Sequence, residues 1–425
     1  MTDDLGLPGR RELPPEVLDN LRMSLREGMG KPVRRRWPIV AAAAAVVGVL
    51  AGALVTAVLI REPDGTGPVV ANPDFSLDWP KAVKSMDRCW AAIQAQGRAA
   101  SFPARAGWEP QFTVVGEAAV TVVAVMVGDK PFFCETTRTS ATVSDPDDKP
   151  IYTDGGKTAA LLMTDGGTVA GVADPSWPKV EITGQNESAS PFRDLPIFRR
   201  GNLFVYLGRM KPARTAYSVG PTPGEQSRQV PYQAPYLLPQ ASLPAASVID
   251  RPEKPEREST AGAFFKVCTE GAFEAVPDVD AYRAGALLER DDVAVVLARL
   301  GDEVVVCQGG VGYQDGKSAF YRAFPQRLDP PSSIGPLRTE TVGNVDRNGN
   351  EVKPRNSYTG TVPEAAAAVK LDFGTGATVD ATVSNGTFAA WVPDGVSQDI
   401  ENARVAITVL DGAGKVLHQG TLRLY

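Results

Sequence analysis

An uncharged stretch from Pro38 to Ile60 constrains this chain more than any other feature of its sequence. The stretch is 23 residues long and contains eleven Val, Leu or Ile residues. As an α-helix it would span roughly 34 Å, against a hydrocarbon core of about 30 Å. Its aliphatic side chains contribute about −3 to −6 kcal/mol toward membrane insertion. We therefore predict a transmembrane helix over 38–60, with the lipid bilayer as a partner.

The residues that flank this stretch predict its orientation. Lys31, Arg34, Arg35 and Arg36 precede it, whereas Arg61 is soon followed by acidic residues. Because positive charge favours the cytoplasmic side, we expect the N-terminus in the cytoplasm and the C-terminus outside it. A cleaved signal peptide is the alternative, but its apolar region would be about 7–15 residues and would end at small residues. The localisation expected is therefore a cell membrane crossed once, and the abundance of Ala, Val, Gly, Arg, Pro and Asp suggests a bacterial envelope.

Two apolar faces precede the outer part of the chain. Within the predicted membrane helix, small residues recur every four positions, a spacing that lets two helix backbones approach closely and form a homodimer; they are Ala44, Gly48, Gly52 and Thr56. The cytoplasmic tail, 1–37, is too short for a folded domain but predicts one amphipathic helix. Its apolar face consists of Val17, Leu18, Leu21, Leu25 and Met29. Such a helix frays, lies on the lipid surface, or docks on a cytoplasmic protein.

Composition divides the rest of the chain into a stalk, two halves and a linker. The stalk, 61–78, and the linker, 219–259, are rich in Pro and other turn-forming residues. They separate a first extracytoplasmic half, 79–218, from a second one, 260–425.

The two halves share a pattern that indicates a duplication. Gly128 and Asp129 stand six and five residues before Cys134, and Gly301 and Asp302 stand at the same distances before Cys307. Upstream of each pair, without a gap, three valines match: Val120, Val122 and Val123 with Val293, Val295 and Val296. We interpret this as a weak internal repeat, and chance similarity between two hairpins is the alternative.

Each half predicts a helix, a three-stranded antiparallel sheet and a further β-rich region. The helices are expected over 81–96 and 261–273, and strands with glycine or aspartate turns follow each of them. In the C-terminal region short strands recur about every ten residues, which favours an immunoglobulin-like β-sandwich. The fold class predicted is a transmembrane helix followed by a mainly-β (α+β) ectodomain.

Four cysteines, all beyond the predicted membrane helix, predict two disulfides. Four cysteines allow three pairings. The repeat selects Cys89 with Cys134 and Cys268 with Cys307, because each half should then fold by itself. Four reduced core cysteines are the alternative. A metal site is not expected, because no C-x-x-C spacing occurs and His418 is the single histidine.

The same scarcity of histidine argues against an enzyme. Catalytic sets that require a histidine are excluded unless His418 itself serves, and it lies in the predicted last strand. We expect no catalytic residues and no cofactor. The net charge of −6 also argues against a nucleic-acid partner, which needs a basic face.

Three functions remain consistent with these features. The first is a membrane-anchored, non-catalytic extracytoplasmic binding or sensing protein. The second is a transmembrane regulator whose cytoplasmic helix holds a partner; in layout, with a short inner region, one span and an outer β domain, the chain resembles bacterial anti-sigma factors. The third is a passive envelope scaffold, in which the stalk and the linker matter for reach.

Overall fold

The computed structural model describes twelve stretches of the chain, which are residues 77–116, 118–177, 179–185, 197–221, 236–290, 293–311, 319–327, 334–337, 356–374, 378–393, 396 and 404–423. Contacts divide the chain into two units, Met1–Pro68 and Val69–Tyr425, and every described residue belongs to the second. The predicted membrane helix, its dimer face and the docking face of the tail therefore lie outside the described residues. Among the helices that are described, none is long and apolar enough to cross a membrane.

Helix α2 (Trp79–Ala95) opens the first half. The Asp78 side chain accepts a hydrogen bond from the backbone N–H of Lys81, at 3.1 Å, and so caps the first turn. Because of this cap the helix begins two residues earlier than the sequence pattern predicts. Its buried face repeats at helical spacing and contains Ala82, Ser85, Met86, Cys89, Ala92 and Ile93.

The first sheet is antiparallel and has the order β1-β2-β3-β4-β12. Its strands are β1 (Glu109–Val115), β2 (Thr121–Val127), β3 (Lys130–Thr136), β4 (Ser140–Val143) and β12 (Ala246–Ile249). Helix α2 covers one face, where Trp108 and Phe132 pack in the core beneath it. The predicted sheet of three strands is thus too small, because the free edge of β3 pairs with β4.

Strand β12 lies within the predicted linker, 219–259. Residues Ala246–Ile249 pair with β4, from Ala246 opposite Val143 to Ile249 opposite Ser140. One residue further on, Asp250 forms an ion pair with Arg88 of α2 at 2.6 Å. Prolines around the strand suggested a linker, but the four residues between them satisfy the open edge of β4.

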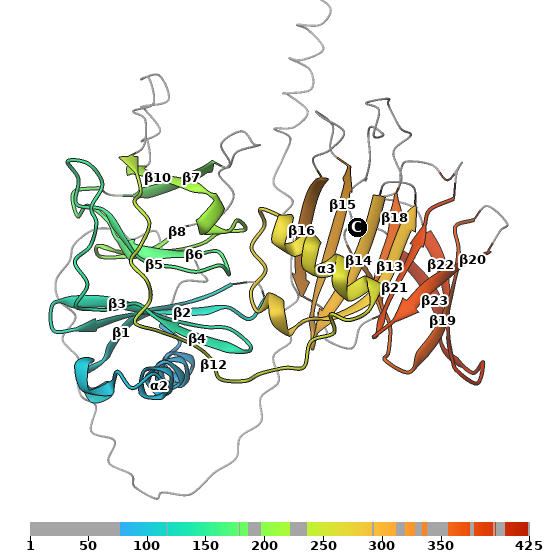
Figure 1. Ribbon diagram of the computed structural model, residues 1–425, viewed down its shortest axis with the longest axis horizontal. Coiled ribbons are helices and arrows are strands. Elements are labelled where there is room, and N and C mark those ends of the chain that lie inside the picture. Colours follow the sequence, from blue (N-terminus) through green and yellow to red (C-terminus); the bar gives the residue numbers. More distant parts are fainter. Residues whose placement is uncertain are drawn as a thin grey trace, which may run out of the picture. The chain divides into compact units, whose positions relative to one another are not determined.

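Two more sheets complete the first half (Figure 1). The nearer one, of order β5-β6-β9-β8, packs on the face of the first sheet opposite α2, through Phe133 and Leu162 among others. The outer one, of order β11-β10-β7, packs on it through Tyr206 and Tyr217. Their strands are β5 (Ala159–Met163), β6 (Thr168–Val172), β7 (Val180–Gln185), β8 (Ile197–Arg200), β9 (Leu203–Leu207), β10 (Ala216–Pro221) and β11 (Tyr236–Leu237).

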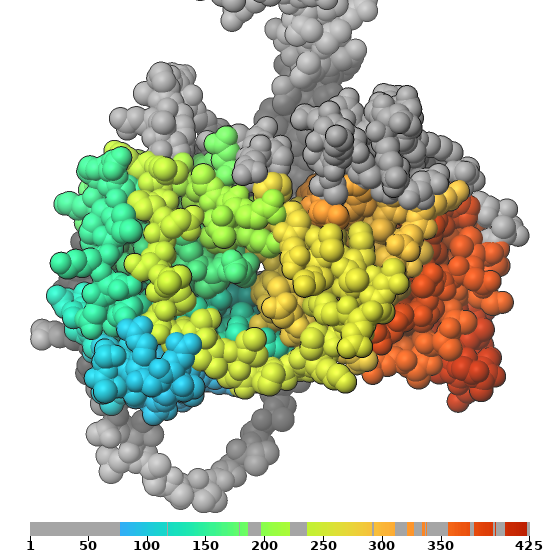
Figure 2. Space-filling view, in the orientation of Figure 1, coloured from blue at the N-terminus to red at the C-terminus, as the bar shows by residue number. Residues whose placement is uncertain are grey.

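The second half again begins with a helix on a sheet. Helix α3 (Thr260–Gly271) is capped by Ser259, whose hydroxyl accepts from the N–H of Gly262 at 3.0 Å. It covers an antiparallel sheet of order β13-β14-β15-β16. The strands are β13 (Arg283–Arg290), β14 (Val293–Leu300), β15 (Glu303–Val311) and β16 (Ala319–Arg327). The outer residues of α2 (blue) and α3 (yellow) reach the surface of the molecule in Figure 2.

A seven-stranded antiparallel sheet follows and is sandwich-like. Its order is β17-β18-β21-β20-β19-β22-β23. Strand β20 pairs with β21 through 382–384 and with β19 through 378–381, so it belongs to both arms of the sheet. Side chains of both arms, such as Tyr358 and Ile407, share one core. The strands are β17 (Gly335–Leu337), β18 (Ser357–Thr361), β19 (Ala366–Asp372), β20 (Thr378–Ser384), β21 (Thr387–Trp391), β22 (Arg404–Asp411) and β23 (Val416–Arg423).

The described residues also form four short 3-10 helices, Ala99–Ser101, Arg105–Gly107, Pro212–Arg214 and Val279–Ala281. The fold is therefore mainly β, built from several antiparallel sheets with one helix against a sheet in each half.

Candidate functional site

In each half, one disulfide joins the helix to the third strand of the sheet that it covers. Cys89 of α2 is bonded to Cys134 of β3, with 6.1 Å between their Cα atoms. Cys268 of α3 is bonded to Cys307 of β15, with 6.2 Å between Cα atoms. All four side chains are fully buried. The predicted pairing is confirmed, and these bonds belong to the cores of the two halves.

A hairpin loop of the first half contacts two acidic residues of the second half, Asp278 and Asp302. This contact, which we call the hairpin junction, consists of residues 137–140, which connect β3 to the start of β4, together with Asp278 and Asp302. The Asp278 carboxylate accepts hydrogen bonds from the hydroxyls of Thr139 at 2.5 Å and Thr137 at 2.6 Å, and from the N–H of Thr139 at 3.2 Å. One carboxylate therefore holds both sides of the loop.

Asp278 adopts a backbone conformation that favours glycine. Its φ is 55°, which costs a residue with a Cβ about 1 kcal/mol or more. The hydroxyl and N–H donors of the loop compensate for this cost by fixing the carboxylate. Backbone strain of this kind is a recognised mark of positions that serve more than packing.

An ion pair lies beside this carboxylate. Arg138, between the two threonines, donates to Asp302 at 2.7 Å. Gly301 makes room for it, because a Cβ at that position would stand 2.1 Å from the Arg138 guanidinium. The glycine is needed for the turn as well, since its φ is 63°.

A buried carboxyl group stands two residues before the loop. Glu135 of β3 is 3 % exposed, and its Oε2 accepts from the Thr164 hydroxyl at 3.0 Å. It lies on the face of β3 opposite Cys134, toward β5 and β6. Burial raises the pKa of Glu135 to about 7, and the negative charge of Asp278 adds to that rise.

A second buried carboxyl group stands next to Asp302. Glu303 is 1 % exposed, and its Oε2 accepts from the Tyr282 hydroxyl at 3.2 Å. Its Oε1 is buried and has no hydrogen-bond partner among the described residues. Burial raises the pKa of Glu303 to about 7, and the charges of Asp302 and Asp278 act in the same direction. The hairpin junction therefore lies between two carboxyl groups that titrate near neutrality.

A groove runs beside the junction. Its volume is about 560 Å³, and its lining includes Glu135, Thr139 and Asp278. Two aliphatic side chains on its rim are open to solvent, Leu243 at 89 % and Ile249 at 62 % exposure. The groove thus combines acidic and hydroxyl groups inside with apolar groups at its rim.

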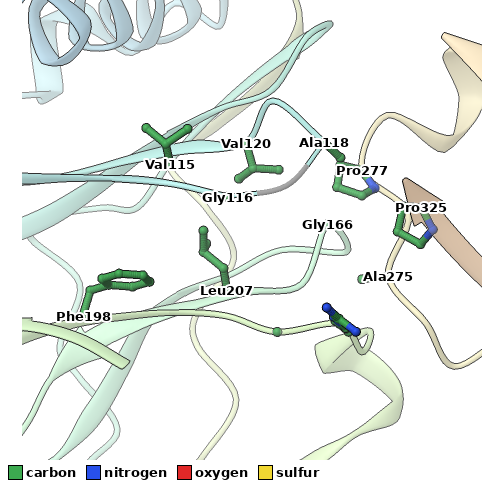
Figure 3. A pocket seen from close by; sticks show the side chains of 12 residues that line it. Val115, Gly116, Ala118, Val120, Gly166, Phe198, Leu207, Ala275, Pro277 and Pro325 are labelled. Carbon is green, nitrogen blue, oxygen red and sulfur yellow. The ribbon is translucent and has the colours of Figure 1, made fainter. Parts of the chain in front are cut away.

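A smaller cavity of about 200 Å³ is mainly apolar. Figure 3 shows Val115, Val120, Phe198 and Leu207 around it, with Pro277 and Pro325 on the opposite side. Ala118, also in its lining, and the next residue Ala119 have φ values of 52° and 51°. The turn at its mouth is therefore strained.

The remaining candidates from the sequence lie away from the junction or outside the described residues. His418 lies in β23 opposite Val409. Among the described residues, no group of three or more His, Cys, Asp or Glu side chains is arranged to hold a metal ion. The faces Ala44, Gly48, Gly52, Thr56 and Val17, Leu18, Leu21, Leu25, Met29 are not described and stay predictions.

Sequence reasoning missed three acids at or beside the junction, Glu135, Asp278 and Glu303. One signal was available for the first of them: Glu135 stands in a strand whose neighbours are apolar, so a carboxylate there must be buried or unpaired. Asp278 and Glu303 carry no comparable local signal, because loop and turn positions commonly hold acidic residues.

The chain was compared with protein-family models, curated proteins and solved structures. No family model, no curated protein and no solved structure matches the chain.

Proposed function

We propose that the protein is a membrane-anchored, non-catalytic binding or sensing protein whose part from residue 61 onward lies outside the cytoplasm of a bacterial cell. The observation that carries this proposal is the pair of buried disulfides. Structural disulfides persist in oxidising compartments and are rare in the cytosol. The predicted membrane helix over 38–60 supplies the route by which these cysteines leave the cytoplasm.

The junction supports a role in sensing rather than catalysis. Glu135 and Glu303 have the raised pKa values that acid–base catalysts often show. Both side chains are almost fully buried, at 3 % and 1 % exposure, and each accepts from a hydroxyl group, although Glu135 also contributes to the lining of the groove. Buried groups of this kind suit a response to pH better than a reaction on a substrate.

We further propose that the two halves arose by duplication. In both, the disulfide joins a helix to the third strand, and the cysteine of that strand lies opposite a matching valine, Val123 for Cys134 and Val296 for Cys307. The turns before them hold glycines of nearly equal φ, 62° at Gly128 and 63° at Gly301. The residues that match in sequence therefore occupy equivalent positions in the two sheets, which supports the proposed duplication.

Labelling of introduced cysteines tests the topology. Leu243→Cys places a thiol on a side chain that is 89 % exposed, and Leu21→Cys places one in the predicted cytoplasmic tail. A membrane-impermeant maleimide added to intact cells should label the first variant at once. It should label the second only after the membrane is permeabilised.

The reverse labelling pattern would overturn the proposal, and so would free thiols in the wild-type protein. In the unmodified chain, maleimide should react with no cysteine after denaturation without reductant and with four after reduction. Reaction before reduction would mean that the compartment is reducing.

A further inference from the structure

We propose that the hairpin junction is a proton-operated latch between the two halves of the ectodomain, closed in acid and loosened as the pH rises through neutrality. This inference rests on the proposed sensing function and names the proton as the stimulus.

The closed latch is held by charge-assisted hydrogen bonds. The Asp278 carboxylate binds four donors of the loop, the hydroxyls of Thr137, Thr139 and Ser140 and the N–H of Thr139. The Arg138 guanidinium binds Asp302. Hydrogen bonds of this type are short and about twice as strong as neutral ones, and they hold only while the two sides are in register.

The balance of charge at the latch is set by the two buried acids. With Glu135 and Glu303 protonated, Asp278 and Asp302 face Arg138 and leave one excess negative charge. With both ionised, the same small volume holds three. Like charges repel strongly where water is excluded, so ionisation favours separation of the halves.

Other charged groups surround the latch. Arg88 of α2 donates to the backbone oxygens of Thr137 and Ser140, but its charge is paired with Asp250 at 2.6 Å. Asp165, Glu253 and Asp280 line the groove on the same side and add negative charge. Arg257 donates to the backbone oxygens of Val279 and Tyr282, and the acidic side chains that act on it are Asp280 and Glu256.

Two more arginines lie near Arg138. Arg283 and Arg299 line a second groove there, together with Arg138, Asp302 and Glu364. Arg283 also donates to the Asn385 side chain, at 3.3 Å. Their positive charge lines that groove, whereas the carboxyl oxygens of Glu135 and Glu303 accept from the hydroxyls of Thr164 and Tyr282.

The direction of the response follows from the pKa values. Burial holds both carboxyl groups protonated up to about pH 7, whereas their ordinary pKa is 4.5. Because the closed state binds more protons between these limits, its population falls as the pH rises toward 7. If opening returns a carboxyl to water, the ratio of closed to open molecules falls about tenfold per group between pH 6 and pH 8.

Hydrogen–deuterium exchange of the full-length protein in detergent micelles measures this ratio. The reporters are peptides that cover 137–140 and 278–281, where the N–H groups of Thr139 and Ala281 are bonded across or beside the latch. Exchange rates are corrected for the intrinsic effect of pH and compared with a peptide from β22. In the wild type, protection of the reporters should fall about 100-fold between pH 6 and pH 8, while β22 should stay constant.

Neutral substitutions identify the groups responsible. Glu135→Gln and Glu303→Gln should each reduce the change to about tenfold, and the double variant should show less than a threefold change. Glu289→Gln, an equal change of charge at an exposed position of β13, should behave like the wild type. If the double variant fails to fold, the two single variants decide.

A wild-type reporter whose corrected protection does not depend on pH overturns the latch. A response that persists at full size in the Gln variants overturns it as well. Neither result bears on the cysteine labelling above, so the latch and the proposed location can fail separately.

Discussion

Removing the disulfide of the first half should destabilise that half more than any single core substitution. The perturbation is the double variant Cys89→Ala/Cys134→Ala, which deletes the bond without leaving buried hydroxyls. The bond closes a loop with a sequence separation of 45. In the chain-entropy account, a loop of that size contributes about 4 kcal/mol. Loss of two buried sulfur atoms adds about 1 kcal/mol each.

Tryptophan fluorescence during urea unfolding measures this cost. Trp90 and Trp108 pack edge to face, 5.9 Å apart, in the core that contains both cysteines. With an m value of about 2 kcal/mol per M urea, a cost of 4 to 6 kcal/mol moves the midpoint down by about 2 to 3 M. The matched control is Cys268→Ala/Cys307→Ala, whose loop has a separation of 39. It should move the Trp90 and Trp108 signal much less.

A shift below 0.5 M in the Cys89→Ala/Cys134→Ala variant would refute this reasoning. It would mean that the unfolded first half is already as compact without the bond as with it. Equal shifts in both double variants would instead mean that the two halves unfold as one cooperative unit.

Three further predictions concern protonation, backbone strain and packing. The free energy of unfolding should fall by about 3 kcal/mol for each of Glu135 and Glu303 as the pH rises from about 4.5 to about 7, since both pKa values are raised in the folded state; urea titrations at several pH values check this, and a stability that rises over the window contradicts it. Ala119→Gly should raise the melting temperature, because it relieves a φ of 51° worth about 1 kcal/mol, and calorimetry that shows a decrease would argue against strain in this turn. Phe265→Ala, at a fully buried position of α3, should cost about 3 to 5 kcal/mol; its urea midpoint should fall accordingly, and a neutral result would mean that the second core is loosely packed.

Local sequence signals were sufficient for the regular part of the fold. The matching valines of the repeat, which start at Val120 and Val293, mark the strands: β2 begins at Thr121 and β14 at Val293. These strands are runs of β-branched residues between glycine or aspartate turns, so turn chemistry and strand propensity indicate the same limits. The cysteine pairing was accessible too, because the repeat placed each helix cysteine and strand cysteine in equivalent positions.

Pairing between distant segments was not accessible in the same way. Ala246–Ile249 follows β4 by more than a hundred residues and is surrounded by prolines, which favour a linker in any local interpretation. It becomes a strand because it pairs with the open edge of β4, and the local sequence of 246–249 does not show that a distant strand has an unpaired edge. The same holds for Asp278, whose role depends on hydroxyls near residue 138.

The position of β12 has a consequence for how the two halves communicate. The chain leaves the first sheet through β12, and Asp250 at its end binds Arg88, which also donates to the backbone oxygens of Thr137 and Ser140. The hairpin loop is therefore fixed from the first half by α2 and its arginine, and from the second half by Asp278. Because the loop is fixed to the first half, a change in its contacts with the second half changes the position of one half relative to the other. Arg88 binds two backbone oxygens of the loop, whereas the second half holds the loop through the side chains of Asp278 and Asp302, so the loop should stay with the first half when the latch opens.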